Sequence, residues 1–451
     1  MMSHNRKLFG TDGVRGRAGQ WPIVPDVITR LAIAAGSQFR GLNGHHSIVI
    51  GKDTRLSGYM VESALQAGFT AMGFKVYLLG PLPTPAVALL TKSLRADLGV
   101  MVSASHNAYA DNGIKFFGPD GYKLSDAIEL CVEESMQSDI PLALSENIGK
   151  AKRIDDAAGR YIEYAKASLP KDLRLNNLRI VVDCAHGAAY KVAPSILWEL
   201  GAEIIPVGVS PTGSNINDAC GAMSIELARE TLLREKADIA VVLDGDADRI
   251  VMIDEKGSSL DGDQILALIT RHFKQENRLS SNIIVGTQMS NLGLERYIES
   301  QGLSLLRSQV GDRYVIEAMR KHGANIGGEQ SGHIILHDYT TTGDGVIAAL
   351  QILAIMQKSQ KKLSELAHIY QSVPQVMINL RLETKIDITD TAIGATIKKA
   401  EHALGKDAYL LVRPSGTEPL LRLMAQGDNE ETLNQVIHEL AETLQKISQR
   451  L

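Results

Sequence analysis

Three aspartates spaced two residues apart give the strongest chemical signal in this chain. Asp244, Asp246 and Asp248 stand between an apolar run at 239–243 and a second run at 250–253. Apolar runs of this length, bounded by glycine and aspartate, are typical of buried strands, so we expect the carboxylates on a tight connection at the edge of a sheet. Three clustered anions repel one another unless a cation lies among them. Their oxygen atoms suit Mg²⁺.

The same aspartates allow two other interpretations. In a calcium-binding EF-hand loop they would fill the first three ligand positions, and Glu255 would fill the twelfth. That loop needs glycine at its sixth position, where this chain has Arg249, and helices at its flanks, where this chain has strand-like runs. A solvated acidic turn without metal is the second alternative. The other polar loops of the chain make this alternative less favourable.

Ser105 is the best candidate for a nucleophile. It lies in the segment Ser-Ala-Ser-His-Asn at 103–107, directly after the apolar run 98–102. A serine hydroxyl can attack a substrate or carry a phosphoryl group where a base or a cation is close, and His106 and Lys115 are near in sequence. No Gly-x-Ser-x-Gly elbow surrounds it, which disfavours an α/β-hydrolase. A serine that only caps the following turn is the alternative.

A second polar loop offers groups that suit a sugar. Within Gly-Glu-Gln-Ser-Gly-His at 328–333, Glu329 supplies a carboxylate and Ser331 a hydroxyl. Such groups match sugar hydroxyls, and the carboxylate also matches an amino group. His333 is a candidate for proton transfer, although a lone histidine is more often structural.

Two glycine-containing loops carry arginines that could bind an anion. The segment 413–419 reads Arg-Pro-Ser-Gly-Thr-Glu-Pro. Its arginine offers a fork for phosphate oxygens, its hydroxyls donate, and its glycine lets backbone N–H groups approach; an ordinary hairpin loop is the alternative. Arg15 lies in a glycine-rich, flexible loop at 9–16, where a solvated arginine is the simpler interpretation. No segment has the pattern of a nucleotide-binding P-loop.

The composition indicates a soluble, cytoplasmic, globular protein. Its 451 residues suggest three or four domains at roughly 150 residues each. A net charge of −5 argues against a nucleic-acid partner, and three widely spaced cysteines suit reduced thiols rather than disulfides. No signal segment is predicted, and the longest apolar stretch, 346–356, is too short to cross a membrane. We therefore expect a small-molecule substrate and no membrane partner.

Strand-like and helix-like segments alternate along most of the chain in three rounds. The rounds end at the Ser105 loop, at the aspartate triplet and at the loop 328–333. Alternation of this kind predicts mostly parallel sheets, whose ligands lie beyond the carboxyl ends of the strands. A shorter α+β pattern follows Pro374. We predict four domains, at 1–155, 156–256, 257–372 and 373–451.

Four of these motifs stand in the order known from one family. Ser-Ala-Ser-His-Asn, Asp-Gly-Asp-Ala-Asp-Arg, Gly-Glu-Gln-Ser-Gly-His and Arg-Pro-Ser-Gly-Thr-Glu-Pro follow one another along the chain. Together they resemble the α-D-phosphohexomutase superfamily, and with segments 9–16 and 311–314 they resemble its bacterial amino-sugar branch. The resemblance covers essentially the whole chain. It implies an α/β fold of three related mixed-sheet domains plus a C-terminal α+β domain around a central cleft.

The resemblance implies a phosphoserine and a metal site. Ser105 would carry the phosphoryl group, and an oxygen of that group would join Asp244, Asp246 and Asp248 around Mg²⁺. One position departs from the family pattern, because Ala108 stands where proline is frequent. That difference can loosen the loop but removes no reacting group.

The resemblance also implies roles for the remaining polar residues. Glu329 and Ser331 would recognise the hydroxyl or amino positions of the sugar. One set would bind the substrate and its unreacting phosphate: Arg249, Arg413, Ser415, Gly416 and Thr417. Another set would lie near the reacting groups, where general acid and base catalysis is expected: Arg15, Lys115 and His333.

The implied reaction converts glucosamine 6-phosphate into glucosamine 1-phosphate through a 1,6-bisphosphate, for amino-sugar nucleotide and cell-wall precursor synthesis. A hexose 1,6-bisphosphate would prime the enzyme, and a homodimer is compatible with the sequence. Alternatives are specificity for glucose or mannose phosphates, a metal-dependent phosphomonoesterase that releases inorganic phosphate, and a non-catalytic binding protein of the same shape.

Overall fold

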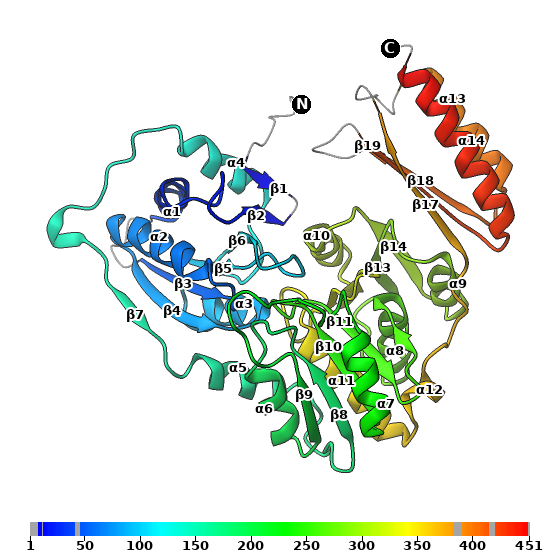
Figure 1. Cartoon of the computed structure of the whole chain (residues 1–451), viewed down its shortest axis with the longest axis horizontal. Helices are drawn as coiled ribbons and strands as arrows, with labels where there is room; N and C mark the ends of the chain where they lie inside the picture. Colours follow the sequence, from blue (N-terminus) through cyan, green and yellow to red (C-terminus); the bar gives the residue numbers. More distant parts are fainter. Residues whose placement is uncertain (1–7, 11, 41–45, 383–389, 415–419, 450–451) are drawn as a thin grey trace.

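The computed structural model describes residues 8–10, 12–40, 46–382, 390–414 and 420–449. They form four sheets, each built from a consecutive part of the chain and covered by its own helices (Figure 1). We call these parts the first to fourth units. No described helix is long and apolar enough to cross a membrane.

The first unit is a seven-stranded sheet with the strand order β1-β2-β6-β5-β3-β4-β7. Helices α1, α2 and α4 pack on one face of the sheet, and α3 packs on the other face. The strands are β1 (Phe9–Gly10), β2 (Gly13–Arg17), β3 (Ser47–Lys52), β4 (Lys75–Pro81), β5 (Leu98–Val102), β6 (Asp111–Phe117) and β7 (Ala151–Arg153). The helices are α1 (Pro25–Phe39), α2 (Gly58–Ala71), α3 (Thr84–Ser93), α4 (Asp126–Ser135) and the short 3₁₀ helix η1 (Ser145–Asn147).

The second unit is a five-stranded sheet with the order β12-β11-β10-β8-β9, and the third is a four-stranded sheet with the order β14-β13-β15-β16. The second contains β8 (Arg179–Asp183), β9 (Glu203–Val207), β10 (Ile239–Leu243), β11 (Ile250–Asp254) and β12 (Ser259–Leu260), with α5 (Ala157–Lys166), α6 (Val192–Glu199) and α7 (Glu226–Glu235). The third contains β13 (Ile283–Thr287), β14 (Ser304–Ser308), β15 (Ile326–Gly328) and β16 (Ile334–Leu336), with α8 (Gly262–Gln275), α9 (Leu292–Ser300), α10 (Asp312–His322), α11 (Gly345–Ser359) and α12 (Leu363–Leu366).

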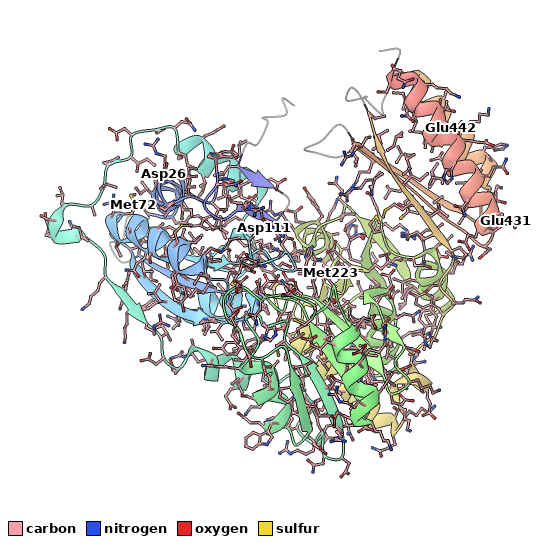
Figure 2. All side chains as sticks on the ribbon, viewed as in Figure 1. Asp26, Met72, Asp111, Met223, Glu431 and Glu442 are labelled. Atoms are coloured by element: carbon pink, nitrogen blue, oxygen red, sulfur yellow. The ribbon has the colours of Figure 1, made fainter. Side chains whose placement is uncertain are left out.

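The fourth unit is a three-stranded antiparallel sheet with two helices on one face. It contains β17 (Gln375–Arg381), β18 (Tyr409–Pro414), β19 (Leu420–Gln426), α13 (Thr391–Leu404) and α14 (Glu430–Ser448). Leu421 and Leu423 of β19 pack against Ile437 of α14 because alternate strand residues face the same side. Glu431 and Glu442 lie on the outer side of α14, away from the sheet (Figure 2).

The first three units repeat one sheet topology. The strand orders β6-β5-β3-β4, β11-β10-β8-β9 and β16-β15-β13-β14 correspond to one another. In each unit, one strand (β5, β10 or β15) runs parallel to its neighbour on one side (β3, β8 or β13). The chain then turns back, so that the next strand (β6, β11 or β16) pairs with it in an antiparallel hairpin. These hairpins carry the Ser105 loop, the aspartate triplet and the loop 328–333. The expected fold class is therefore confirmed, while the expectation of mostly parallel sheets gives way to mixed sheets with one hairpin in each repeat.

One apolar core joins the first three units. It contains Val87 of α3, Tyr161 of α5 and nearly every residue of the apolar stretch 346–356 in α11. The stretch is buried along its whole length because α11 packs against α5, α8 and strands of both the second and third sheets. Three hairpins are thereby held in fixed positions relative to one another.

One local expectation was wrong. The glycine-rich segment at 9–16 was expected to be a flexible loop, but its described residues form strands: β1 pairs with β2, and β2 then pairs with β6. Strand β4 ends at Pro81, in agreement with the preference of proline for strand ends. The domain boundaries stay predictions, although β12 pairs with β11 beyond the boundary placed at 256.

Asp344 provides a test of how these units are joined. It caps the N-terminus of α11, where it accepts hydrogen bonds of 3.0 Å from the amides of Val346 and Ile347. Tyr161 of α5 donates to both of its oxygens, at 3.0 and 3.1 Å. Burial raises the pKa of Asp344 from 3.8 to about 6.

We predict that Asp344→Asn changes how stability depends on pH. Because folding raises the pKa of Asp344, its carboxyl contributes most to stability below pH 3.8, and that contribution is lost as pH rises through about 6. Relative to the variant, the wild type should lose up to about 3 kcal/mol between these values. Urea unfolding at about pH 4.5 and about pH 7 measures the change, with the exposed Asp139→Asn as control. A gap between wild type and Asp344→Asn that stays constant over this range contradicts the prediction.

Candidate active site

Ser105 lies where the first unit meets the second. It follows β5 in a left-handed conformation, with φ of 51°, and its side chain is buried. Its Oγ donates a hydrogen bond of 2.6 Å to Asp244 Oδ2, although the two residues are far apart in the sequence. His106 Nδ1 lies 3.3 Å from the same hydroxyl. The hairpin loops after β5 and β10 therefore meet at one point.

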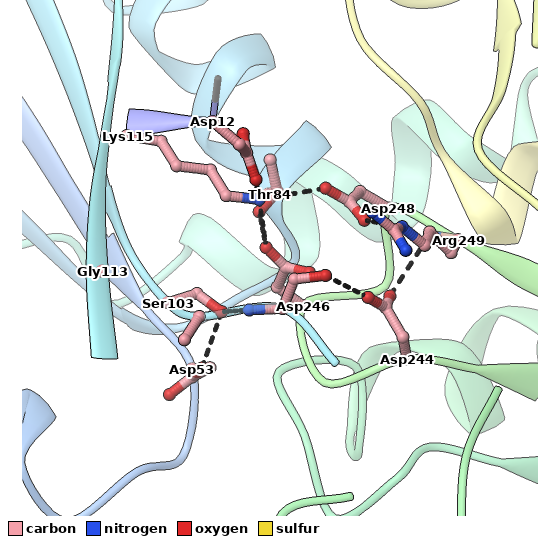
Figure 3. Close-up of polar contacts among 12 residues, drawn as sticks. Asp12, Asp53, Thr84, Ser103, Gly113, Lys115, Asp244, Asp246, Asp248 and Arg249 are labelled. Atoms are coloured by element: carbon pink, nitrogen blue, oxygen red, sulfur yellow. Dashed lines mark hydrogen bonds and ion pairs between the residues drawn. The ribbon is translucent and has the colours of Figure 1, made fainter. Parts of the chain in front are cut away.

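The three aspartates form one buried group between β10 and β11 (Figure 3). One oxygen of each carboxylate lies within 4.8 Å of the others. Gly245 lets the serine loop approach, because a Cβ at that position would lie 2.6 Å from Ser105 O. Burial raises the pKa of Asp244 well above its usual value, and the charges of Asp248 and Asp246 raise it further. A divalent cation among these oxygens would relieve that repulsion.

Two oxygens of this group are buried without a hydrogen bond from the described residues. They are Asp246 Oδ1 and Asp248 Oδ1, of which the second has longer ion-pair contacts, 3.7 Å to His333 Nδ1 and 3.9 Å to Arg249 Nε. Buried polar atoms are rarely left unpaired, so these two atoms indicate a ligand. Carboxylate oxygens are the donors that Mg²⁺ prefers, and the Ser105 hydroxyl lies beside them. The residues present therefore fit a hard divalent cation.

Lys115 brings a buried positive charge to the aspartates. It stands on β6, and its Nζ donates to Asp246 Oδ2 at 2.9 Å and to Asp248 Oδ2 at 3.1 Å (Figure 3). Asp12 Oδ2 lies 3.3 Å from the same nitrogen. Burial alone would lower the pKa of Lys115, but its three carboxylate partners outweigh burial and raise that pKa well above its usual value. Lys115 is therefore a cation in this arrangement.

The N-terminal hairpin adds Arg15 to the site. Arg15 stands on β2, donates to Ala104 O at 3.3 Å and pairs with Asp12. Asp12 Oδ1 also lies 2.5 Å from Lys123 Nζ. The same nitrogen forms a second ion pair, with Asp312 Oδ2 of α10 at 2.6 Å. Burial alone would raise the pKa of Asp12, but its cationic neighbours outweigh burial and lower that pKa. The hairpin thus links the site to the third unit.

Two further contacts fix the aspartate loop. Thr84 at the start of α3 donates from Oγ1 to Asp246 Oδ2 at 2.6 Å, and its amide donates to Asp246 O at 2.9 Å. Arg249 donates its amide to Asp244 Oδ1 at 3.2 Å, and its Nε lies 3.9 Å from Asp248 Oδ1. The aspartates are thus held both from the first unit and from their own hairpin.

The third unit contributes His333, which lies beside Asp248. His333 Nδ1 is 3.7 Å from Asp248 Oδ1, and His333 Nε2 is 3.4 Å from Asp312 Oδ2. Burial alone would lower the pKa of His333, but these two carboxylates outweigh burial and raise it. Gly332 packs against β11, since a Cβ there would lie 2.1 Å from Ile250 O. The loop 328–333 is thereby placed directly beside the aspartate hairpin.

The predicted sugar-binding residues differ in exposure. Glu329 is buried, and its Oε1 accepts a hydrogen bond of 3.0 Å from Gly311 N. Ser331 is exposed. Both stand in the loop that carries His333, so the structure places them on the third-unit side of the aspartate group.

The predicted phosphate-binding residues belong to the fourth unit. Arg413 stands near the end of β18, directly opposite Arg422 of β19. Burial and the charge of Arg422 lower the pKa of Arg413. Ser415, Gly416 and Thr417 lie outside the described residues. Among the described residues, no hydrogen bond or ion pair joins Arg413 to Ser105 or to the aspartates.

Four sequence families match the chain in order. They are described as phosphoglucomutase/phosphomannomutase alpha/beta/alpha domain I at residues 6–141, domain II at 159–257, domain III at 261–373 and the C-terminal domain at 377–443. The chain belongs to the phosphoglucomutase/phosphomannomutase family.

Relatives of known function indicate which branch of this family the chain resembles. The phosphoglucosamine mutase of Parvibaculum lavamentivorans is 54% identical over 442 residues, which cover 98% of this chain and 99% of that protein. The expected superfamily is therefore confirmed, and so is the expected function: the chain is an isomerase of the phosphoglucosamine mutase type.

Solved structures show the same fold at low identity. A phosphoglucomutase/phosphomannomutase family protein from Burkholderia thailandensis matches with a TM-score of 0.80 and 22% identity over 97% of each chain. The N-acetylphosphoglucosamine mutase of Aspergillus fumigatus, solved in complex with GlcNAc-6P and magnesium, matches with a TM-score of 0.67 and 16% identity, over 98% of this chain and 95% of that one.

Sequence reasoning missed several residues of the site. They are Asp12, Thr84, Lys123 and Asp312. Asp12 and Asp312 stand inside motifs that were recognised for their arginines and glycines, so a charge count of those motifs could have found them. Thr84 and Lys123 follow ordinary turns and carry no local signal, because their partners lie far away in the sequence.

We predict that Asp246→Asn weakens binding of Mn²⁺, used as a probe for Mg²⁺, by about tenfold or more, because it removes the charge of a carboxylate whose Oδ1 accepts no hydrogen bond. Calorimetric titration measures the affinity. Asp254→Asn is the matched control: this buried carboxylate lies at the far end of β11, and its Oδ1 already accepts two amide hydrogen bonds of 2.9 Å. Equal Mn²⁺ affinities for the two variants would show that the triplet is not a metal site.

Proposed function

We propose that Ser105 is the phosphate carrier in the interconversion of glucosamine 6-phosphate and glucosamine 1-phosphate. The observation that supports this most strongly is the hydrogen bond of 2.6 Å between Ser105 Oγ and Asp244 Oδ2. It puts a hydroxyl beside three carboxylates that fit a divalent cation, which is the arrangement that phosphoryl transfer to and from a serine requires.

Asp244, Asp246 and Asp248 would hold Mg²⁺, together with an oxygen of the phosphorylated Ser105. When bound, Mg²⁺ neutralises charge on the transferring phosphoryl group. Lys115 and Arg15 add positive charge from the first unit, and the raised pKa of Lys115 keeps its ammonium charged.

Transfer breaks the bond between Ser105 Oγ and phosphorus and forms a bond between phosphorus and the free hydroxyl of the sugar. The proton of that hydroxyl leaves to a basic group of the site, and Ser105 Oγ takes up a proton as its bond to phosphorus breaks. The candidates for this acid and base catalysis are Arg15, Lys115 and His333; Arg15 and Lys115 stay cationic, so His333 in its neutral form is the candidate that can accept a proton. The resulting bisphosphate reorients, and its other phosphate returns to Ser105 Oγ. One phosphate is therefore always distant from the serine and needs a separate binding site.

The third and fourth units would supply recognition. Glu329 and Ser331 would contact the amino or hydroxyl positions of the sugar, and Arg249 would contact the substrate. The residues that would bind the distant phosphate are Arg413, Ser415, Gly416 and Thr417. We further propose that a hexose 1,6-bisphosphate primes Ser105 and that the enzyme works in the cytoplasm.

We predict that Ser105→Ala abolishes mutase turnover, since no other hydroxyl touches the aspartate group from the serine loop. Activity is measured with glucosamine 6-phosphate, Mg²⁺ and a trace of hexose 1,6-bisphosphate, and intact mass shows whether the protein carries one phosphoryl group. Ser57→Ala is the control, because its hydroxyl accepts from Asn112 Nδ2 at 2.8 Å and does not contact the aspartates. Near-native activity in Ser105→Ala, or release of inorganic phosphate in place of the isomer, would overturn the proposal.

We also predict that kcat/KM of the wild type is highest for glucosamine 6-phosphate among the glucosamine, glucose and mannose phosphates. Glu329→Gln should reduce the preference for glucosamine over glucose by about tenfold, because the amide cannot pair with an ammonium group. Steady-state rates with the three substrates measure the ratio. An unchanged ratio in Glu329→Gln would remove this residue from substrate recognition.

A further inference from the structure

Arg55 is a buried cation whose guanidinium binds one carboxylate and several backbone carbonyls. It stands in the connection between β3 and α2, is 1% exposed, and its Nε donates to Asp53 Oδ2 at 2.8 Å. A buried guanidinium is costly unless its charge is paired and its donors are used. The acceptors of its remaining N–H donors therefore indicate the role of Arg55.

Those donors bind backbone carbonyls of the serine loop, the connection between β5 and β6. Arg55 Nη2 donates to Ser105 O at 3.0 Å and to Asn107 O at 2.8 Å. Arg55 Nη1 donates to Asp111 O at 3.0 Å and also to Ala108 O. Asp111 begins β6 near the middle of the molecule (Figure 2). One guanidinium thus ties down the whole connection between β5 and β6.

Asp53 extends this hold to the amide of Ser105. Asp53 Oδ2 accepts a hydrogen bond of 2.7 Å from Ser103 Oγ (Figure 3). Ser103 Oγ in turn accepts a hydrogen bond of 2.9 Å from Ser105 N. Both the N–H and the C=O of Ser105 are therefore connected to the Asp53–Arg55 pair.

Asn217 adds a second hold from the other side. It belongs to the second unit, where its backbone N–H donates to Ala185 O at 2.9 Å. Its Nδ2 donates to Ser105 O and to Asn107 O, at 2.9 Å each. The carbonyl of Ser105 is therefore bound from its own unit by Arg55 and from the unit of the aspartates by Asn217.

This double hold has a physical purpose. A residue with a Cβ disfavours the left-handed conformation that Ser105 adopts, and such a conformation persists only where the surroundings impose it. We infer that Arg55 and Asn217 are positioning residues that impose this conformation and so keep Ser105 Oγ within reach of Asp244. The inference rests on the proposed role of Ser105, and it assigns these residues no contact with substrate.

Arg55→Lys tests the inference, because lysine keeps the charge beside Asp53 but cannot reach four carbonyls at once. We expect kcat to fall about 100-fold with KM for glucosamine 6-phosphate nearly unchanged, since small displacements of a reacting group have effects of that size. Arg307→Lys is the matched control: Arg307 pairs with Glu295 at 2.8 Å and donates to Ser290 O at 2.7 Å, in the third unit. Its kcat should stay within about twofold of the wild type.

Hydrogen exchange separates this inference from the proposed function, because it needs no turnover. Peptides covering 103–112 should exchange faster in Arg55→Lys than in the wild type, and those covering the aspartate hairpin should not. If the wild type lacks mutase activity, the proposed function fails while this readout still reports on the hold. Unchanged kcat together with unchanged exchange in Arg55→Lys would overturn the inference.

Asn217→Ala covers the case in which Arg55→Lys does not fold. It removes the two hydrogen bonds from the second unit, so we expect kcat to fall about tenfold with KM nearly unchanged. Because Asn217 is itself left-handed, with φ of 58°, alanine there should also lower the unfolding midpoint slightly. Asn325→Ala is its control, since Asn325 Nδ2 also donates to a backbone carbonyl, Arg278 O at 2.8 Å, but lies in the third unit. Equal activities for the two asparagine variants would contradict the inference.

Discussion

Three carboxylates buried within 4.8 Å of one another are the constraint on which the rest of the site depends. Such a group cannot stay fully charged inside a protein unless positive charge surrounds it. Two of its oxygens accept no hydrogen bond from the described residues, and burial together with the charges of Asp248 and Asp246 raises the pKa of Asp244. The neighbouring side chains are arranged accordingly, since Lys115 from the first unit and His333 from the third both contact Asp248.

The repeated hairpin explains how three units can serve one point. Each unit delivers its polar loop where a parallel strand turns back into an antiparallel partner, and the shared core of α3, α5 and α11 fixes the three sheets relative to one another. The loops can then differ freely in chemistry: a hydroxyl in the first, carboxylates in the second, and a carboxylate, a hydroxyl and an imidazole in the third. The repeat supplies position, and the loop residues supply function.

The fourth unit is attached in a different way. Its apolar core is separate from that of the first three units, and polar contacts join it to the third, such as the pair of Arg296 with Asp428 and the hydrogen bond of 2.7 Å from Leu292 N to Gln426 Oε1. Interfaces of this kind are typical of domains that can move relative to their neighbours. Attachment of this kind suits the proposed reaction, in which the fourth unit would bind one phosphate of an intermediate that reorients between two transfers.

The sequence by itself determined the fold class and named the candidate reacting groups. Strands at 98–102 and 239–243 were predictable because apolar runs and the turn residues that end them are local properties. The polar loops that follow these strands carry Ser105 and the aspartates, so the candidate nucleophile and metal ligands could be named from residue type and spacing alone.

Only the tertiary structure decided which residues surround those groups. Thr84 contacts Asp246 and Asn217 contacts Ser105 across more than one hundred positions of the chain. Arg55 binds a loop that begins fifty positions later. The N-terminal hairpin likewise became a strand pair only because β6 offered it an edge. A threonine, an asparagine or an arginine has no chemical meaning until packing supplies its partner, and packing is settled by the whole core rather than by any local pattern.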